Sequence, residues 1–449
     1  MDVLSKPKRP QPRPVRLEGE PVANRYRERL DRHVAFGHKT YTPTQLVVRR
    51  AEGCWLESVE GQRLLDFSSG VLVANLGHNH PGFEAAYARY TDGVPRNCYN
   101  AISPLEVEAA ERLVCNLNHP KLQKVLWADS GSAGIIKAIW AAQRARPEKH
   151  ILIATRHGFH GKKGLAGDVT GDWSPNPNVR FISFPMYEVR DVSLLPSAEA
   201  GKDRLLGPYA QELEQLKVEH GDDLLLLITE PYLGAAGSFH PPKWYLQFLS
   251  KWCAENDVIF ILDEVQSCHG RTGRMYAYQT YGIDPDIVVL GKGLGNGEPV
   301  AAAVGRADLM DSLDYGEGSD TYSGNPHACA AVLAALDIYE SEPVVENCRA
   351  MSRVLQEGLS QLRDDFPCVA HVRGEGLVWG MEMADYRGLP AEVVANATVL
   401  ECYRHGLHLL GPLSKKVLRI SPPLVITEDE LREGLNRMRQ ALTALTKRL

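Results

Sequence analysis

The sequence predicts an α/β protein in which a large domain with a mostly parallel sheet is joined to a smaller α+β domain. Between about residues 120 and 305, short apolar runs rich in β-branched residues alternate with helical patterns. Strands that are apolar throughout and separated by helices are typical of a parallel sheet covered on both faces. After about residue 335 the pattern changes to two helices followed by a strand-like alternation. We therefore expect the large domain over residues 65–335 and the smaller one over 336–449.

The expected strands of the large domain follow one another along the chain. The segment QKVLWA (123–128) leads through the turn DSGS into a helical pattern that ends near residue 145. A second helix is expected over residues 242–256. Each further strand is a short apolar run, and these runs lie at 150–155, 222–229, 258–263, 286–290 and 300–305.

The two chain ends are expected to contribute to the smaller domain. Residues 1–64 include a basic arm with four prolines in its first 16 residues, which favours an extended segment, disordered or laid along a partner subunit. The stretch CWLESVEGQRLLDF (54–67) is typical of a hairpin that turns at Glu60-Gly61. A strand-like alternation covers 368–383, and a helix is expected near 390–405. Thr427 and Glu430 have the spacing of a capping box that opens a C-terminal amphipathic helix.

Composition points to small-molecule chemistry. A net charge of -6 gives no basic face for nucleic acid or an anionic membrane, and no run of 18 apolar residues occurs. The nine cysteines form no CxxC or Cys/His cluster, so neither a metal site nor a disulfide framework is indicated. We expect a reduced, cytoplasmic protein.

Lys292 is the first candidate catalytic residue. It follows the expected strand 286–290, at the strand end where ligands bind in open α/β sheets. A loop lysine is usually a solvated surface charge. Here glycines at alternate positions from 291 to 297 allow close approach of a ligand, and a partly desolvated amine there has the lowered pKa that Schiff-base chemistry needs.

Three further positions complete a possible cofactor site. Asp263 ends the strand 258–263 and suits either a helix cap or a protonated ring nitrogen. Gly131 and Ser132 lie at the start of a helix, where free amides cap the helix or bind phosphate. Phe159 lies in a glycine-flanked loop and offers a face for stacking a flat ring. A phosphate cradle, a ring face, a carboxylate and a lysine together match pyridoxal phosphate (PLP).

With these motifs the sequence resembles the class III aminotransferases, PLP-dependent enzymes of fold type I that include ornithine, acetylornithine, 4-aminobutyrate and ω-amino acid transaminases. The resemblance runs from LDFSSGVLVANLGHNHP to LRISPPLVITEDEL and is most specific in ILDEVQSCHGRTGRMYAYQTYGIDPDIVVLGKGLGNGEP. It implies a mostly parallel sheet of the seven-stranded type. It also implies amino transfer from an amine or amino acid donor to a small α-keto acid through a Schiff base on Lys292.

The resemblance also assigns roles residue by residue. Lys292 is implied to move the proton, and Asp263 to pair with the ring nitrogen. Arg419 is implied to bind a substrate α-carboxylate, and Thr321 to reach the phosphate across a homodimer interface. The remaining assignments are cofactor contacts at Gly131, Ser132, Phe159, Glu230 and Gln266, and a substrate pocket at Leu72, Val73 and Tyr99.

Two departures from the family pattern are visible. Where many relatives read SGSEA, this chain has Ala133 and Gly134, which removes a charge but keeps the phosphate amides. Where relatives that alternate between ω-amino donors and α-keto acids often have a glutamate that masks the arginine, this chain has Ala235. The second departure disfavours an ornithine or 4-aminobutyrate transaminase.

The same residues disfavour two other functions and leave one alternative open. A nicotinamide oxidoreductase is disfavoured because the glycines of GKGLGNG do not have the G-x-G-x-x-G spacing. A non-catalytic relative is disfavoured because every expected catalytic position is filled. A PLP-dependent decarboxylase, lyase or aminomutase of the same fold remains the alternative, because substrate contacts decide which bond breaks.

Overall fold

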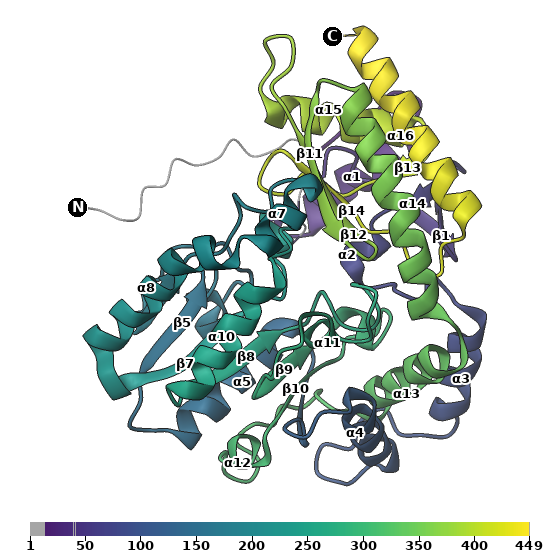
Figure 1. Ribbon diagram of the computed structural model, residues 1–449. Coiled ribbons are helices and arrows are strands. Elements are labelled where there is room, and N and C mark those ends of the chain that lie inside the picture. The colour runs from purple at the N-terminus through teal and green to yellow at the C-terminus, as the bar shows by residue number, and fades with distance from the viewer. Residues whose placement is uncertain (1–13, 39, 41, 449) are drawn as a thin grey trace.

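A seven-stranded sheet forms the centre of the computed structural model, which describes residues 14–38, 40 and 42–448 (Figure 1). The strand order is β4-β10-β9-β8-β7-β5-β6. β10 is antiparallel to both neighbours, and every other pair is parallel. The strands are β4 (Lys124–Ala128), β5 (Ile151–Thr155), β6 (Val179–Ile182), β7 (Leu224–Thr229), β8 (Ile259–Asp263), β9 (Ile287–Leu290) and β10 (Ala301–Gly305).

The prediction of a mostly parallel sheet is confirmed, and each of its six expected strands is present. β6 was not expected. It is an edge strand of four residues with an arginine and a half-buried middle, so it lacks the continuous apolar run that marks the other strands.

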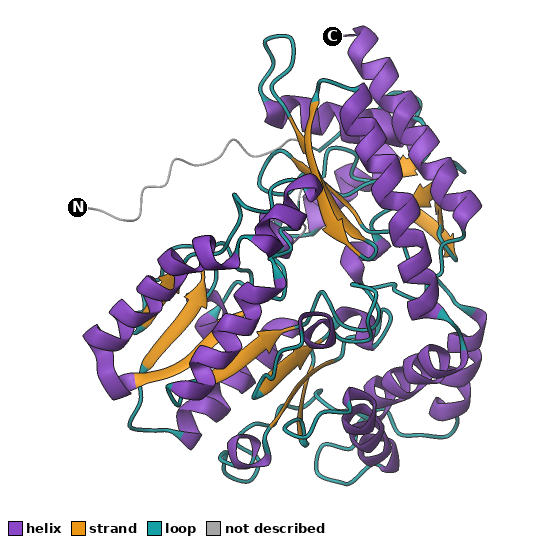
Figure 2. Ribbon diagram, in the orientation of Figure 1, coloured by secondary structure: helices purple, strands orange, loops and turns teal. Residues whose placement is uncertain are grey.

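Helices cover both faces of this sheet, as Figure 2 shows. Successive residues of one strand enter different cores: Ile261 packs with residues of α5 (Gly131–Ala145), and Leu262 packs with residues of α10 (Lys243–Glu255). This alternation explains why the strands are apolar throughout. Both helices occur where the sequence predicted them.

The smaller part of the molecule contains two further sheets. β11 (Val369–Glu375), β12 (Val378–Met383) and β14 (Val417–Ile420) form one, and β1 (Val48–Glu52), β2 (Trp55–Ser58), β3 (Arg63–Asp66) and β13 (Leu407–His408) form the other. The predicted hairpin is the β2–β3 pair, in which Gly61 has a φ of 83°. β13 pairs with β3 in parallel, so residues near both chain ends share one sheet. The exact domain boundaries remain a prediction.

The helices of this part include α14 (Val344–Asp365), α15 (Ala391–Arg404) and α16 (Glu428–Arg448). The predicted capping box is present, because the Glu430 amide donates to Thr427 Oγ1 at 3.2 Å and the Thr427 amide donates to Glu430 Oε2 at 3.1 Å. The other helices are α2 (Ser69–Leu72), α3 (Pro81–Thr91), α4 (Pro104–Leu117), α6 (Gly164–Asp168), α7 (Leu195–Ala200), α8 (Lys202–His220), α9 (Gly234–Gly237), α11 (Ala277–Tyr281), α12 (Ala307–Met310) and α13 (Pro326–Ser341), with 3₁₀ turns at Phe36–His38, Val192–Leu194, Gly221–Asp223 and Lys292–Leu294.

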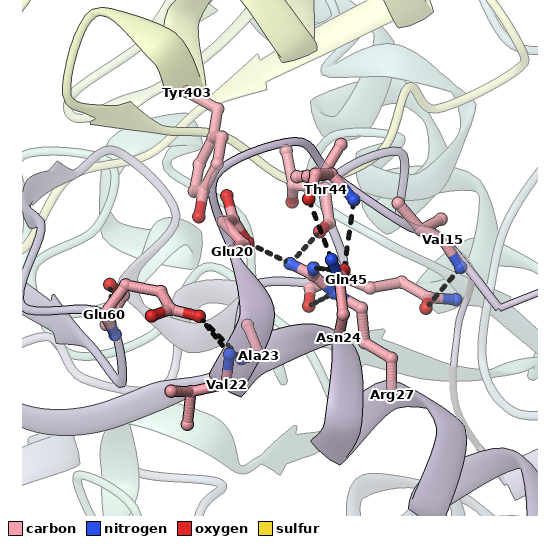
Figure 3. A network of polar contacts seen from close by, with 12 residues as sticks. Val15, Glu20, Val22, Ala23, Asn24, Arg27, Thr44, Gln45, Glu60 and Tyr403 are labelled. Atoms are coloured by element: carbon pink, nitrogen blue, oxygen red, sulfur yellow. Dashed lines mark hydrogen bonds and ion pairs between the residues drawn. The ribbon is translucent and has the colours of Figure 1, made fainter.

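A polar network fixes α1 (Pro21–His33) to the rest of the chain (Figure 3). The buried Arg27 donates to Glu20 Oε2 at 2.7 Å and to the carbonyls of Thr44 and Gln45 at 3.0 and 3.1 Å. Glu60 Oε1 accepts two backbone amides in the first turn of α1, at 2.6 and 2.8 Å. The predicted proline-rich arm lies almost entirely outside the described residues. Within the described part of the chain, no helix has the length and apolar character needed to cross a membrane.

Candidate active site

The candidate site lies at the carboxyl ends of the central strands. In Figure 1 the ends of β8 and β9 point toward the middle of the molecule, near the sheet of β11, β12 and β14. Asp263 ends β8, and Lys292 opens the 3₁₀ turn two residues after β9. A cavity of about 320 Å³ at this edge is lined by eight of the predicted residues: Val73, Gly131, Ser132, Phe159, Glu230, Asp263, Gln266 and Lys292.

Lys292 has the electrostatic environment of a reactive amine. Removal from water lowers its pKa from 10.5 to about 8, while the charge of Asp263 opposes this shift. Part of the Lys292 population is therefore neutral near physiological pH. A neutral amine is the form that attacks an aldehyde.

Asp263 is held by a histidine that the sequence analysis did not identify. Its Oδ2 lies 2.7 Å from His160 Nδ1, and its Oδ1 accepts the amide of Val265 at 3.0 Å. His160 is buried, and its Nε2 has no hydrogen-bond partner among the described residues. A contact between residues 103 positions apart has no sequence signal, although His160 directly follows Phe159 in GFHG. His160 therefore orients the carboxylate.

The start of α5 forms a cradle for an anion. Ser130 caps the helix by accepting the amide of Ala133 at 3.4 Å, and Gly131 and Ser132 lie in the first turn. A Cβ at Gly131 would come within 2.8 Å of Val265, so only glycine fits there. The amides and the dipole of a 15-residue helix favour a phosphate at this end.

Glu230 links the loop of Phe159 to the single turn α9. Its two carboxylate oxygens accept the amides of Phe159 at 3.0 Å and Gly234 at 3.1 Å. Burial raises the pKa of Glu230 to about 7. Gln266 packs against the same turn, because a Cβ at Gly234 would meet its side chain at 2.3 Å. Gln266 Oε1 is buried and has no partner within the described chain, so its amide can turn toward a ligand.

Arg419 is a buried cation with unused donors. It lies on β14, and its Nη2 donates to the carbonyl of Gly234 at 3.1 Å. Its Nε has no partner among the described residues, none of which forms an ion pair with it. Burial lowers its pKa, because the charged guanidinium loses water. Such a group suits an anionic ligand.

Comparison with known proteins identifies the family. The family model "Aminotransferase class-III" matches residues 36–442. The chain belongs to this family. It is 33% identical to the acetylornithine aminotransferase of Agrobacterium fabrum over 415 residues, which are 91% of this chain and 96% of that enzyme.

Solved structures of transaminases are also similar to this class III aminotransferase. An amine transaminase from an uncultivated Pseudomonas species in its PLP-bound form has a TM-score of 0.78 and 27% identity, covering 92% of this chain and 96% of that one. The ω-transaminase of Pseudomonas jessenii in complex with PMP has a TM-score of 0.82 and 27% identity, covering 94% and 98%. The fold is fold type I, and PLP is the cofactor of this aminotransferase.

The residues of the cavity fit this cofactor. The lowered pKa of the Lys292 amine, the carboxylate fixed by His160, the glycine cradle at a helix start and the unpartnered Gln266 Oε1 are compatible with the aldehyde, ring nitrogen, phosphate and ring oxygen of PLP. When bound, PLP supplies an aldehyde for amine capture and a ring that accepts electron density.

The remaining predicted residues of this aminotransferase lie elsewhere. Thr321 and Tyr99 line a separate cavity of about 460 Å³, where Tyr99 Oη lies 3.1 Å from Ser319 Oγ. Leu72 is 1% exposed and packs with Tyr232 and Val378, as a core residue does. The described chain alone does not bring these three residues to Lys292, and their roles stay predictions.

Proposed function

We propose that this aminotransferase transfers an amino group from an amine or amino acid donor to a small α-keto acid, with Lys292 as the residue that binds the cofactor covalently. The observation that carries the proposal is the reactive amine of Lys292 beside the oriented carboxylate of Asp263. The experiment is product analysis with a panel of amines, amino acids and keto acids. Equal amounts of a new amine and a new keto acid are expected, whereas release of carbon dioxide or ammonia would contradict the proposal.

Each side chain has a defined task in this proposal. The Lys292 amine removes a proton from the substrate carbon that carries the amino group. It then returns this proton to the carbon on the cofactor side of the amino nitrogen. Asp263 keeps the ring nitrogen protonated, and His160 keeps Asp263 in place. Phe159 stacks on the ring, and Arg419 holds the α-carboxylate of the acceptor.

The Asp263→Asn variant is expected to lower the rate of amino transfer roughly 10- to 150-fold, the effect of losing a charged hydrogen bond of about 1.5–3 kcal/mol. Stopped-flow measurement of a single half-reaction checks this value. Lys292 should still bind the cofactor, because its amine is unchanged. Asp284→Asn, at an exposed loop, is the matched control. A near wild-type half-reaction in Asp263→Asn would remove the residue from its role.

The pH dependence of cofactor uptake follows from Lys292. The neutral amine is the reactive form, so covalent capture of PLP by cofactor-free protein should speed up as pH rises, with a midpoint of about 8. Capture is slow below this pKa, where the amine is protonated, and reaches a plateau above it. Rapid-mixing absorbance at a series of pH values measures the midpoint. A midpoint near 10.5, the ordinary value for lysine, would contradict the assigned environment.

We also propose a homodimer in which Thr321 completes the partner's site. Two large exposed side chains, Tyr99 and Tyr315, line the cavity that contains Thr321, and the exposed Tyr322 directly follows Thr321 in the chain. Exposed apolar groups gathered in one region are typical of an interface. Light scattering tests the dimer, and a monomer that is fully active would contradict it.

We also propose a cytoplasmic location. The nine cysteines are free, as is usual for proteins of a reducing compartment.

A further inference from the structure

A further cavity lies apart from the cofactor site. It has a volume of about 320 Å³ and shares no residue with the cavity of Lys292. Its walls come from the loop 272–274, the start of α10, the helices α11 and α14, and the end of β11. We call it the α14 cavity and define it by Lys243, Thr272, Arg274, Arg349, Glu375 and Gly376.

The larger and the smaller part of the chain meet at the α14 cavity. Gly376 lies directly against the loop that follows β8, because a Cβ there would come within 2.2 Å of the Arg271 carbonyl oxygen. The same carbonyl accepts the amide of Leu377 at 3.1 Å. On the other side, a Cβ at Gly273 would meet Arg349 Cγ of α14 at 3.1 Å. A ligand in this cavity would therefore contact both parts of the chain.

The lining of the α14 cavity is polar throughout. Ten residues line it, and all of them except Gly273 and Gly376 have polar side chains. Pockets for organic substrates are instead lined mainly by apolar and aromatic side chains, with a few polar groups among them. This lining suits a small, strongly hydrated ligand.

The lining also carries surplus positive charge. Its cations are Lys243, Arg274 and Arg349, and its one carboxylate is Glu375, which leaves a net charge of +2. Arg349 pairs with the exposed Glu346 at 2.7 Å. Neither of the other two cations forms an ion pair within the part of the chain that the structure describes. A divalent anion would balance this charge.

Two buried hydroxyl groups of the lining are available to such an anion. Thr272 is only 4% exposed, and its Oγ1 has no hydrogen-bond partner among the described residues. The Oγ1 of Thr280 is also buried without a partner there. Buried hydroxyls usually form hydrogen bonds, so each exception needs an explanation. An oxyanion in the cavity would accept hydrogen bonds from both hydroxyls.

Glu375 distinguishes between divalent anions. Its Oε2 lies 3.5 Å from His240 Nδ1 and accepts a hydrogen bond from Tyr281 Oη at 3.4 Å. Both contacts involve Oε2, which leaves Oε1 available. Hydrogen phosphate carries an O–H group that a carboxylate can accept, whereas sulfate has no donor and is repelled. The carboxylate therefore favours phosphate over sulfate.

We propose that the α14 cavity binds inorganic phosphate in its hydrogen phosphate form. Lys243, Arg274 and Arg349 balance its charge, Thr272 donates a hydrogen bond to it, and Glu375 accepts its O–H group. The site goes beyond amino transfer and does not depend on it, because no residue of the cofactor cavity takes part.

Calorimetry on the holoenzyme, in buffer free of phosphate and sulfate, tests this inference. Inorganic phosphate should bind saturably to the wild type, and sulfate should bind about tenfold more weakly. In Lys243→Gln/Arg349→Gln, binding of phosphate should weaken by about tenfold or more. Lys251→Gln, at an exposed site on α10, should keep the wild-type Kd. An unchanged Kd in the double variant would place the phosphate elsewhere and overturn the inference.

The variant Thr272→Val separates a binding role from a structural one. It should bind phosphate about tenfold more weakly, the effect of losing a hydrogen bond to a charged group. Without phosphate its melting temperature should not fall, because the hydroxyl has no partner among the described residues to lose. Wild-type phosphate affinity in this variant would contradict the site.

The variant Glu375→Gln tests the choice of anion. A glutamine amide can donate to phosphate and to sulfate alike, so the preference for phosphate should fall to near one. Both Kd values come from the same titrations. A preference for phosphate that persists in Glu375→Gln would show that another group selects the anion and would refute the assigned role of Glu375.

Discussion

Lys292→Ala is expected to lose covalent retention of PLP and to lower the rate of amino transfer on the order of 10⁴-fold or more, because it removes both the attachment point and the proton carrier. Borohydride reduction followed by peptide mass spectrometry measures the attachment directly. In the wild type the reduced cofactor should be found on Lys292. Among the described lysines, Lys292 alone lines the cavity that also contains Asp263.

The control for this experiment is Lys251→Ala, since Lys251 is exposed on α10 and does not line the cavity. This variant should retain the reduced cofactor on Lys292 and transfer amino groups at the wild-type rate. A reduced cofactor on any lysine other than 292 would refute the assignment. The labelling result does not depend on knowing the substrate.

Arg419→Ala is expected to lower kcat/KM for an α-keto acid acceptor roughly 30- to several-thousand-fold. Truncating one partner of a desolvated guanidinium–carboxylate contact costs about 2–5 kcal/mol. For a donor without an α-carboxylate the loss should be much smaller, because Arg419 then has no anion to bind. Separate kinetics of the two half-reactions give both values.

Arg419 also supports α9 through the Gly234 carbonyl, so a structural loss must be distinguished from a binding loss. Arg419→Lys keeps a positive charge and a donor but not the two-point fork. It should recover part of the activity toward the keto acid. Equal losses in both half-reactions, for both variants, would indicate that Arg419 maintains the fold and does not bind the acceptor.

Most of the central sheet was predictable because β5, β7, β8, β9 and β10 are buried along their whole length, and burial on both faces leaves a continuous apolar run in the sequence. β6 was missed because it lies at the edge and keeps polar positions. The reactive position of Lys292 was predictable from its glycine neighbours and from the strand before it. Each of these signals lies within a short stretch of the chain, so a single sequence is enough to show it.

The contacts that orient the site were not predictable in the same way. The contact joins His160, in the loop after β5, to Asp263, the last residue of β8, and no spacing rule connects the two residues. The position of Arg419 relative to Arg373 depends on β11, β12 and β14 lying side by side, which places Arg373 opposite Gly380 and Gly380 opposite Arg419. Such pairings are set by tertiary packing, which the sequence pattern of a single strand does not encode.

The pairing of β3 with β13 has a consequence for the synthesis of this protein. Gln62 donates to the carbonyl of Tyr403, 341 residues later in the chain. At ordinary translation rates a ribosome needs roughly 20–70 s to make the residues between them. During that interval the edge of β3 has no strand to pair with, and an unpaired edge is a site of aggregation. Any chain that ends before residue 407 leaves this edge open permanently.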